Sequence, residues 1–231
     1  MVDLGPCNSH YLEVTGDAHY VSKSAPVGDN NGHTIEFMVD FMPVAWPAVS
    51  PTQYVTFAGT YIGFGWFEIE VPAGFTTKAG TAKFGTSRNS VVKYSGGGAV
   101  TLGQRYRMLG KDNGTNVYAW LNGTALGSET AQTDWTAAQA ARVFDTKGTF
   151  YLGFDDLLTE YFPIRWYEVW IKFNGVLILH YKPNENDTAK TQLTDLSGYG
   201  NHGTISGTLN THYRWASAWL KNVAAAAGST S

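Results

Sequence analysis

The chain has 231 residues, enough for one β sandwich with a sizeable core. Hydrophobic residues make up 43% of it and charged residues 15%, a composition that excludes a disordered chain. The net charge is −3 and Lys and Arg form no run, so we do not expect nucleic acid as a partner. Aromatic residues are abundant, with 8 Trp, 13 Tyr and 12 Phe, and these residue types favour strands and flat contact surfaces.

A single cysteine, Cys7, excludes an intrachain disulfide and a zinc site built on thiolates. The N-terminal residues have neither the basic region nor the apolar core of a secretory signal. No apolar run approaches the length of about 18 residues that a membrane span needs. We therefore expect no membrane partner, and we expect synthesis in the cytoplasm without a cleaved signal.

The hydrophobic pattern has a period of two along most of the chain, which is typical of half-buried strands. In residues 33–41 the apolar set is Ile35, Phe37, Val39 and Phe41. In residues 64–72 one face carries Phe67, Ile69 and Val71, the other carries Trp66, Glu68 and Glu70, and Pro72 ends the strand.

A series of hairpins is predicted next. Residues 104–128 read as three strands joined by turns at 112–115 and at Asn122-Gly123. Residues 148–154 and 164–173 read as two more strands, and Asn174-Gly175 turns the second of them into a strand at 176–183. Asn-Gly between apolar runs is the strongest short-range hairpin signal, because both central residues must adopt positive φ.

Strict alternation in residues 164–173 assigns the side chains of this long strand to two faces. It places Tyr167, Val169, Ile171 and Phe173 on one face and Trp166, Glu168 and Trp170 on the other.

Helical signal is weak elsewhere in the chain. One short helix is predicted at residues 134–144, capped by Asp134, and residues 221–231 read as a flexible tail. About a dozen short strands at regular spacing predict an all-β, two-sheet antiparallel sandwich. Residues 1–220 are expected to form a single domain, because no linker interrupts them.

The order of these elements resembles the concanavalin A-like lectin/glucanase jelly roll in its LamG-like form. The motifs that carry the resemblance are "YLEVTGDAHYV", "HTIEFMVDF", "GTNVYAWLNGTALGS", "GTFYLGF" and "PIRWYEVWIKFNG", in that order. The resemblance covers about residues 11–207 and implies an antiparallel jelly-roll sandwich whose first and last strands lie side by side.

The stretch "LTDLSGYGNHGTISG", residues 193–207, is similar to the "D-SG-GNHGT" motif that usually precedes the first strand of a LamG-like domain. Here it follows the last predicted strand, as in LamG-like modules of bacteriophage virion proteins. This resemblance implies a capsid decoration, fibre or tail component that is oligomeric with other virion subunits. Such a protein would reach the virion surface after lysis, with cell-surface glycan as a second candidate partner.

The same stretch has a structural interpretation, which we favour. Asp195 and Ser197 accept backbone N–H bonds, and Asn201 and His202 tie the turn to a neighbouring strand. The positive φ angles come from glycines, namely Gly198, Gly200 and Gly203. The alternative makes Asp195 and Asn201 calcium or sugar ligands, but calcium needs about six to eight oxygens and the loop offers about three.

Two further groups of acidic residues are candidate sites. Asp155 and Asp156 follow a predicted strand and are candidate calcium ligands, although a solvated pair in a loop is the favoured reading. No other cofactor is indicated. The resemblance also raises a glucanase site, because family-16 glucanases place Glu, Asp and Glu at alternate positions of one strand. Here Glu68 and Glu70 are followed by Pro72, so no catalytic residue is expected.

The candidate ligand-binding residues combine tryptophans and glutamates that share predicted faces. Trp rings can stack on the apolar faces of sugars while carboxylates bind their hydroxyls, and the same rings can instead be buried in the core or against another subunit. The predicted function is a non-enzymatic virion surface protein, with a stand-alone lectin or a glycan hydrolase or lyase as alternatives. The candidates are Trp46, Trp66, Glu68, Glu70, Trp166, Glu168 and Trp170.

Overall fold

The structure is a computed structural model, and its described part is built of strands and turns without a helix. The predicted helix at 134–144 and the predicted tail at 221–231 lie outside the described residues. The described residues are 11–14, 20–24, 34–47, 54–60, 65–71, 78–88, 91–127, 149–155, 160–183 and 191–206.

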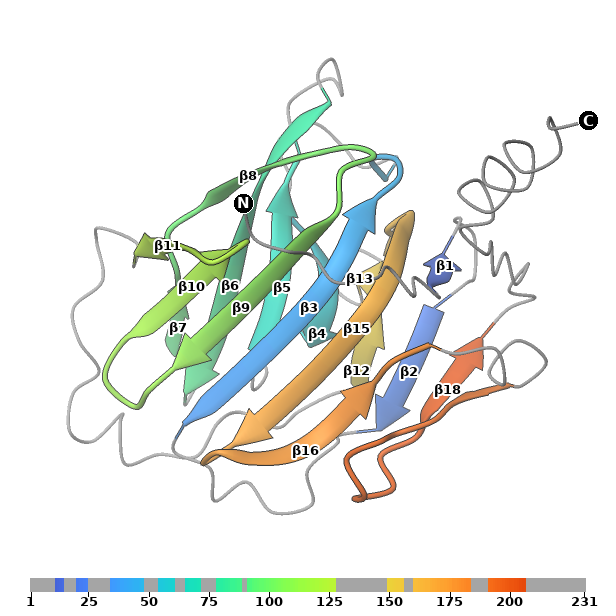
Figure 1. Cartoon of the computed structure of the whole chain (residues 1–231). Helices are drawn as coiled ribbons and strands as arrows, with labels where there is room; N and C mark the ends of the chain where they lie inside the picture. Colours follow the sequence, from blue (N-terminus) through green and yellow to red (C-terminus); the bar gives the residue numbers. More distant parts are fainter. Residues whose placement is uncertain are drawn as a thin grey trace, which may run out of the picture.

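Two antiparallel sheets face each other in a sandwich (Figure 1). The first is described with seven strands, and β16 pairs with β15 beside the main path. Its order is β1 (Leu12–Val14), β15 (Ile164–Phe173), β3 (Ile35–Pro43), β9 (Tyr106–Asp112), β10 (Val117–Leu121) and β11 (Thr124–Gly127), with β16 at Val176–Tyr181.

The second sheet is described with nine strands, and a small pair made of β13 (Phe154–Asp155) and β14 (Glu160–Tyr161) stands apart. In the nine-stranded sheet β8 (Gly98–Thr101) pairs with β6 beside the main path. The order is β17 (Gln192–Leu193), β18 (Gly203–Ser206), β2 (Tyr20–Ser24), β12 (Thr149–Leu152), β4 (Tyr54–Thr60), β5 (Gly65–Glu70), β6 (Ala79–Arg88) and β7 (Val91–Tyr94).

The chain crosses repeatedly between the two sheets, and every described strand pairing is antiparallel. Strand β18 pairs with β2, with Ile205 opposite Val21, so elements from the two ends of the described chain lie side by side. The predicted all-β, two-sheet antiparallel jelly-roll sandwich is confirmed.

Aromatic side chains from both sheets fill the core. The apolar set of β3, namely Ile35, Phe37, Val39 and Phe41, is completely buried, as its alternation predicts. Phe37 meets Phe67 of the opposite sheet with ring centroids 4.7 Å apart. Such pairs add about 0.5–1.5 kcal/mol beyond the area that they bury, so they lock the two sheets in register.

Both Asn-Gly pairs form the predicted tight turns. Asn122 and Gly123 have φ of 49° and 82°, and Asn174 and Gly175 have φ of 46° and 79°. Positive φ at both central residues is the signature of a type I′ hairpin turn. The Asn122 Oδ1 also accepts the N–H of Arg107 at 2.9 Å, which fixes the end of β9 against the turn.

A β-bulge in β15 corrects the predicted face assignment of this strand. Trp166 pairs with Phe41 and Glu168 pairs with Asp40, so Tyr167 is an extra residue without a partner in β3. An extra residue reverses the alternation beyond it. Trp166 therefore points into the core, only 1% exposed, on the same side as Val169, and the prediction that it shares a face with Glu168 and Trp170 is wrong.

One predicted glycine role is also wrong. Gly198 and Gly200 have positive φ, but Gly203 does not and instead begins strand β18. A Cβ at Gly203 would lie 2.6 Å from a methyl carbon of Val21 and 3.2 Å from the Tyr181 hydroxyl. The requirement at Gly203 is therefore close packing rather than an unusual backbone conformation.

Gly110 in β9 gives a direct test of the sandwich packing. A Cβ at this position would lie 2.2 Å from the ring of Phe84 in the opposite sheet. We expect Gly110→Ala to lower the free energy of unfolding by about 1–3 kcal/mol, because the core must move to admit the methyl group. Urea denaturation followed by tryptophan fluorescence measures the change.

The control is Thr204→Ala, a small change at an exposed position of β18. It should alter the free energy of unfolding by less than about 0.5 kcal/mol. Equal stability of wild type and Gly110→Ala would contradict the contact between Gly110 and Phe84.

Candidate functional site

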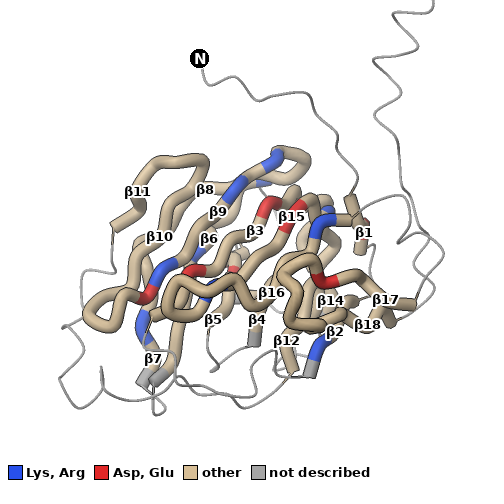
Figure 2. Tube along the Cα trace, turned by 60° about the horizontal axis from the view of Figure 1, so that its bottom comes forward, with Lys and Arg blue, Asp and Glu red and all other residues tan. Residues whose placement is uncertain are grey.

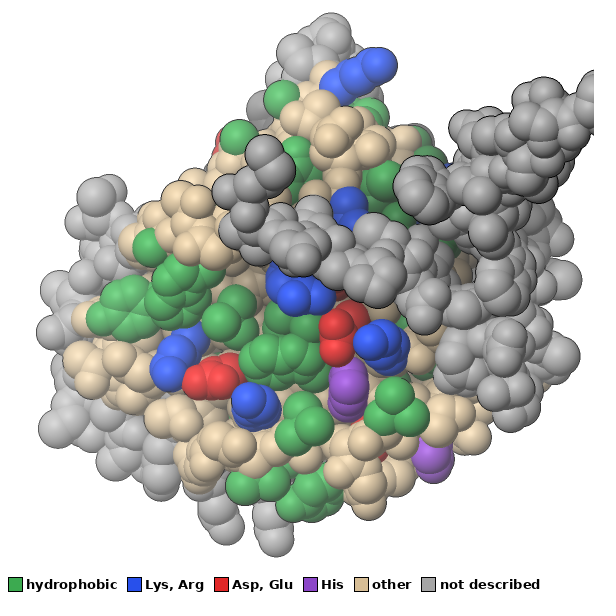
Figure 3. Space-filling model, in the orientation of Figure 1, with side chains coloured by type: hydrophobic (Ala, Val, Ile, Leu, Met, Phe, Trp, Pro, Cys, Tyr) green, Lys and Arg blue, Asp and Glu red, His purple; other side chains and the backbone are tan. Residues whose placement is uncertain are grey.

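A stripe of large apolar side chains crosses the outer face of the seven-stranded sheet. Cross-strand pairing places Trp120 beside Leu109, Leu109 beside Met38, and Met38 beside Trp170. We call these four residues the tryptophan stripe. Hydrophobic side chains are visible on this face in Figure 3, bordered by basic, acidic and histidine side chains.

The tryptophan stripe lines an open pocket of about 480 Å³ together with Arg107, Gly123 and Glu168. Its two tryptophans come from β10 and β15 and are each partly exposed. These strands are three spacings apart in the sheet, which separates the backbones of the two residues by about 14 Å. The stripe that lines the pocket therefore has a tryptophan at each end and the aliphatic side chains of Leu109 and Met38 between them.

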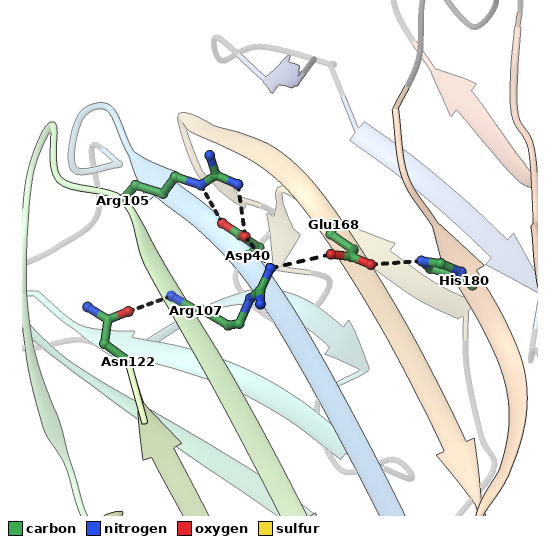
Figure 4. A network of polar contacts seen from close by, with 6 residues as sticks. All are labelled: Asp40, Arg105, Arg107, Asn122, Glu168 and His180. Carbon is green, nitrogen blue, oxygen red and sulfur yellow. Dashed lines mark hydrogen bonds and ion pairs between the residues drawn. The ribbon is translucent and has the colours of Figure 1, made fainter. Parts of the chain in front are cut away.

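An ion-pair network runs along one side of the tryptophan stripe (Figure 4). Asp40 accepts two hydrogen bonds from Arg105, at 2.7 and 2.9 Å, and one from Arg107 at 3.1 Å. Arg107 also lies 3.5 Å from Glu168, whose other carboxylate oxygen lies 3.0 Å from Nε2 of His180. The Asp40 side chain is only 5% exposed, so the arginines compensate a charge that is shielded from water.

A second charged row borders the other side of the stripe. Lys111 bonds Glu36 at 2.9 Å, and Lys172 stands opposite Glu36 in the neighbouring strand. The Lys172 Nζ lies 4.8 Å from the centre of the Trp170 ring, within the range of a cation–π contact. In Figure 2 basic and acidic residues lie close to one another along the neighbouring strands β3, β9 and β15.

Arg105 also makes a cation–π contact, in addition to its bonds with Asp40. Its guanidinium lies 3.8 Å above the ring of Tyr167, the extra residue of the bulge. Burial raises the pKa of the Tyr167 hydroxyl above its ordinary value, although Arg105 and Arg165 counteract part of this rise. Arg105 is thus held by a carboxylate and a ring, whereas Arg107 is 60% exposed beside the pocket.

Two of the sequence-predicted ligand residues, Glu168 and Trp170, lie in this pocket. Trp166 does not, since the bulge turns it into the core, where its ring stacks on Phe57. Trp46 is partly buried and packs edge-on against Phe162 with centroids 6.2 Å apart, so it caps the core.

The remaining predicted ligand residues lie in the other sheet. Trp66 is completely buried and Glu68 is 3% exposed, and the indole N–H donates a hydrogen bond of 3.0 Å to the carboxylate. Glu70 is exposed at the end of β5. These three residues belong to β5 of the nine-stranded sheet and Trp170 to β15 of the seven-stranded sheet, so the structure divides the predicted set between two sheets.

Sequence reasoning missed Trp120, Leu109, Met38 and Arg107. The signal for Trp120 was present, because it alternates with the buried Val117, Ala119 and Leu121 in the predicted strand. Local alternation gives the face of each strand, but only the register of β10, β9, β3 and β15 brings the four together.

The bend at residues 193–206 is organised around the carboxylate of Asp195. This group accepts hydrogen bonds from the backbone N–H groups of His180, Ser197 and Asn201 at 2.8, 3.0 and 2.8 Å. The Ser197 hydroxyl lies 2.7 Å from the same carboxylate, and the ring Nδ1 of His202 accepts the Asp195 N–H at 3.1 Å.

The bend is also tied to strand β16. The side-chain amide of Asn201 donates to the carbonyl of Ile178 at 2.7 Å, and the Tyr181 hydroxyl donates to the carbonyl of Asn201 at 2.5 Å. Both carboxylate oxygens of Asp195 are occupied by donors within the bend, which favours the structural reading of this stretch over a ligand site.

These bonds set the titration behaviour of Asp195. Burial acts to raise the pKa of its carboxyl, but the hydrogen bonds from Ser197, His180 and Asn201 outweigh burial and bring the pKa below its ordinary value. A carboxyl with a lowered pKa in the folded state stabilises that state at neutral pH. The contribution is lost as the pH falls below about 4 and through the lowered pKa.

We therefore expect Asp195→Asn to lower the free energy of unfolding at pH 7 by about 1–3 kcal/mol, because charge-assisted hydrogen bonds are lost. The variant should also lose stability less steeply than wild type as the pH falls from about 5 to 2. Urea denaturation across this pH range measures both. Glu70→Gln, at an exposed carboxylate, controls for the loss of one negative charge, and parallel curves for wild type and Asp195→Asn would contradict the account.

The described part of the chain gives no support for a calcium site. Among those residues no group of three His, Cys, Asp or Glu side chains is placed to hold a metal ion. Asp155 lies in β13 and Asp156 is outside the described residues. The described residues also contain no helix of the length and apolarity needed to cross a membrane.

Comparison with known proteins gives structural likeness alone. No protein-family model matches the sequence, and neither does any curated protein. A protein of Bacteroides ovatus whose name proposes carbohydrate binding superimposes with a TM-score of 0.58 at 16% identity, over 89% of this chain. The chain spans 61% of that protein's length.

Two other solved structures are similar at lower scores. A pentraxin from Limulus polyphemus has a TM-score of 0.48 at 11% identity, over 72% of this chain and 77% of its own. The enzymatically active domain of tailspike protein 2 from bacteriophage CBA120 has a TM-score of 0.40 at 12% identity, over 84% of this chain and 30% of its own. The strand topology and the Bacteroides likeness agree on the fold, an antiparallel two-sheet jelly-roll sandwich of the lectin-like type.

Proposed function

We propose that this chain is a non-enzymatic, lectin-like module that binds a carbohydrate chain along the tryptophan stripe. The observation that carries the proposal is the open pocket lined by Trp120 and Trp170, the two ends of the stripe. Sugar rings have apolar C–H faces and hydroxyl edges, so they suit a surface that alternates aromatic rings with hydrogen-bonding groups. Arg107, Glu168 and His180 supply such groups beside the stripe.

The fold is compatible with this role, because a protein named for carbohydrate binding shares it. The role itself rests on the pocket, since jelly rolls serve many functions. Binding along the stripe should cost little side-chain entropy, because its side chains lie beside one another on neighbouring strands before a ligand arrives.

The state of the acidic groups supports binding rather than bond cleavage. Glycoside hydrolysis by two carboxyl groups needs one as an acid and the other as a nucleophile or base, placed on opposite sides of the bond. Asp40 and Glu168 instead stand side by side on adjacent strands, and Asp40 is shielded from water by Arg105. We therefore propose adhesion, with a hydrolase or lyase as the alternative that release of reducing ends would reveal.

We propose further that the module works on a virion surface, as a decoration, fibre or tail component attached to other subunits. Its support is the "D-SG-GNHGT" motif after the long hairpin of β15 and β16, which leads into strand β18 beside β2. Mass spectrometry of phage particles from the source lysate tests this setting. Presence of the chain in purified particles supports it, and its absence from them favours the stand-alone lectin.

Replacing either tryptophan of the stripe should weaken carbohydrate binding. We expect Trp120→Ala and Trp170→Ala each to reduce affinity by about tenfold, or about 1.4 kcal/mol, because each removes a stacking ring. A glycan array selects the ligand, and calorimetric titration compares the variants.

Tyr199→Ala is the matched control for this experiment. Tyr199 is an aromatic residue 61% exposed on the 193–206 bend, outside the pocket, so its loss should leave affinity unchanged. Full affinity in both tryptophan variants would overturn the proposed site.

A further inference from the structure

We propose that the carbohydrate bound by the tryptophan stripe is anionic, a chain of uronic acids or similar carboxylate-bearing sugars, and that Arg107 recognises the acidic group. This inference rests on the proposed function and assigns its ligand class. It follows from the hydrogen-bonding capacity and charge that the described residues leave unused beside the pocket.

Among the described residues, the carboxylate partners of Arg107 use only one of its three guanidinium nitrogens. Both of its ion pairs, to Asp40 at 3.1 Å and to Glu168 at 3.5 Å, use the same nitrogen, Nη2. Its Nε and Nη1 make no hydrogen bond to any residue in the described part of the chain. A guanidinium that is 60% exposed and lines the pocket can present these N–H groups to a carboxylate.

The acidic neighbours of Arg107 are already compensated by other groups. Asp40 is held by the two shorter bonds from Arg105, at 2.7 and 2.9 Å. Glu168 has its closer contact, 3.0 Å, with His180 rather than with Arg107. An incoming anion at Arg107 therefore meets a guanidinium held by two single contacts, at 3.1 and 3.5 Å, and does not have to displace a bidentate pair.

Lys172 provides a second cation across the stripe. Its Nζ lies over the Trp170 ring, and no carboxylate among the described residues bonds it, since the facing Glu36 is paired with Lys111. Trp170 thus has a cation at its own ring, and Arg107 lies in the charged row on the other side of the stripe. Acidic substituents on either edge of a bound chain would meet a cation.

The net charge of this face also favours an anionic ligand. The two rows beside the stripe carry four cations, Arg105, Arg107, Lys111 and Lys172, against the three anions Glu36, Asp40 and Glu168. The chain as a whole has a net charge of −3. A local positive excess on a negatively charged protein attracts anionic polymers to this face and away from the rest of the surface.

Polygalacturonate and its methyl ester provide the test, because they share one backbone and differ in whether the carboxylate is free. We expect the chain to bind polygalacturonate at least tenfold more tightly than the ester, with affinity that falls as salt rises from about 50 to 500 mM. Arg107→Gln should lose about tenfold or more in affinity for the acid form, since a charge-assisted hydrogen bond is removed. The loss of affinity for the ester should be clearly smaller, because the ester has no carboxylate to pair with Arg107.

Lys78→Gln is the matched control, because it makes the same charge change at an exposed position directly before β6 of the other sheet. Asp40 keeps both bonds from Arg105 in Arg107→Gln, so the variant should fold, and its melting temperature checks this. Lys172→Gln gives an independent second variant, for which we expect a smaller loss of affinity for polygalacturonate.

The possible failures are distinguishable. Equal binding of the two polymers overturns the anionic ligand class and leaves the proposed carbohydrate site in place. Binding only to a neutral glycan on an array, lost in Trp120→Ala and unchanged in Arg107→Gln, does the same. Binding to no glycan at all overturns both the ligand class and the proposed function.

Discussion

The extra residue in strand β15 is the constraint on which the outer face of the seven-stranded sheet depends. Without Tyr167 in the bulge, strict alternation would place Trp166 outside with Glu168 and Trp170, and the core would lose its stacking partner for Phe57. With the bulge, Trp166 fills the core while Glu168 and Trp170 face outward beside β3. One inserted residue thus separates two tryptophans four positions apart into a packing role and a surface role.

Most ion pairs of this face contribute little to the stability of the fold. Exposed ion pairs such as Lys111 with Glu36 contribute about 0–1 kcal/mol each. Asp40 is different, because its shielded charge would be costly without the bidentate Arg105. Arg105 in turn stacks on Tyr167, so the network couples the bulge to the neighbouring strands and fixes where Arg107 lies.

Sequence predicted the features that depend on local chemistry. The core set of β3, the two Asn-Gly turns and the sandwich itself follow from alternation and positive φ, which neighbouring residues decide. The bulge at Tyr167 and the packing requirement at Gly203 could not be predicted, because both depend on a partner strand distant in sequence. The tryptophan stripe could not be predicted for the same reason, since four strands contribute one residue each and only their register brings these residues together.

The central claim concerns where a ligand contacts the protein, and this contact can be observed directly. Indole N–H resonances in a ¹H–¹⁵N spectrum report on each tryptophan separately during a titration with galacturonate oligosaccharides. The account predicts that the signals of Trp120 and Trp170 shift together and saturably, while those of the buried Trp66 and Trp166 stay in place. Saturable shifts confined to tryptophans outside the stripe would contradict it.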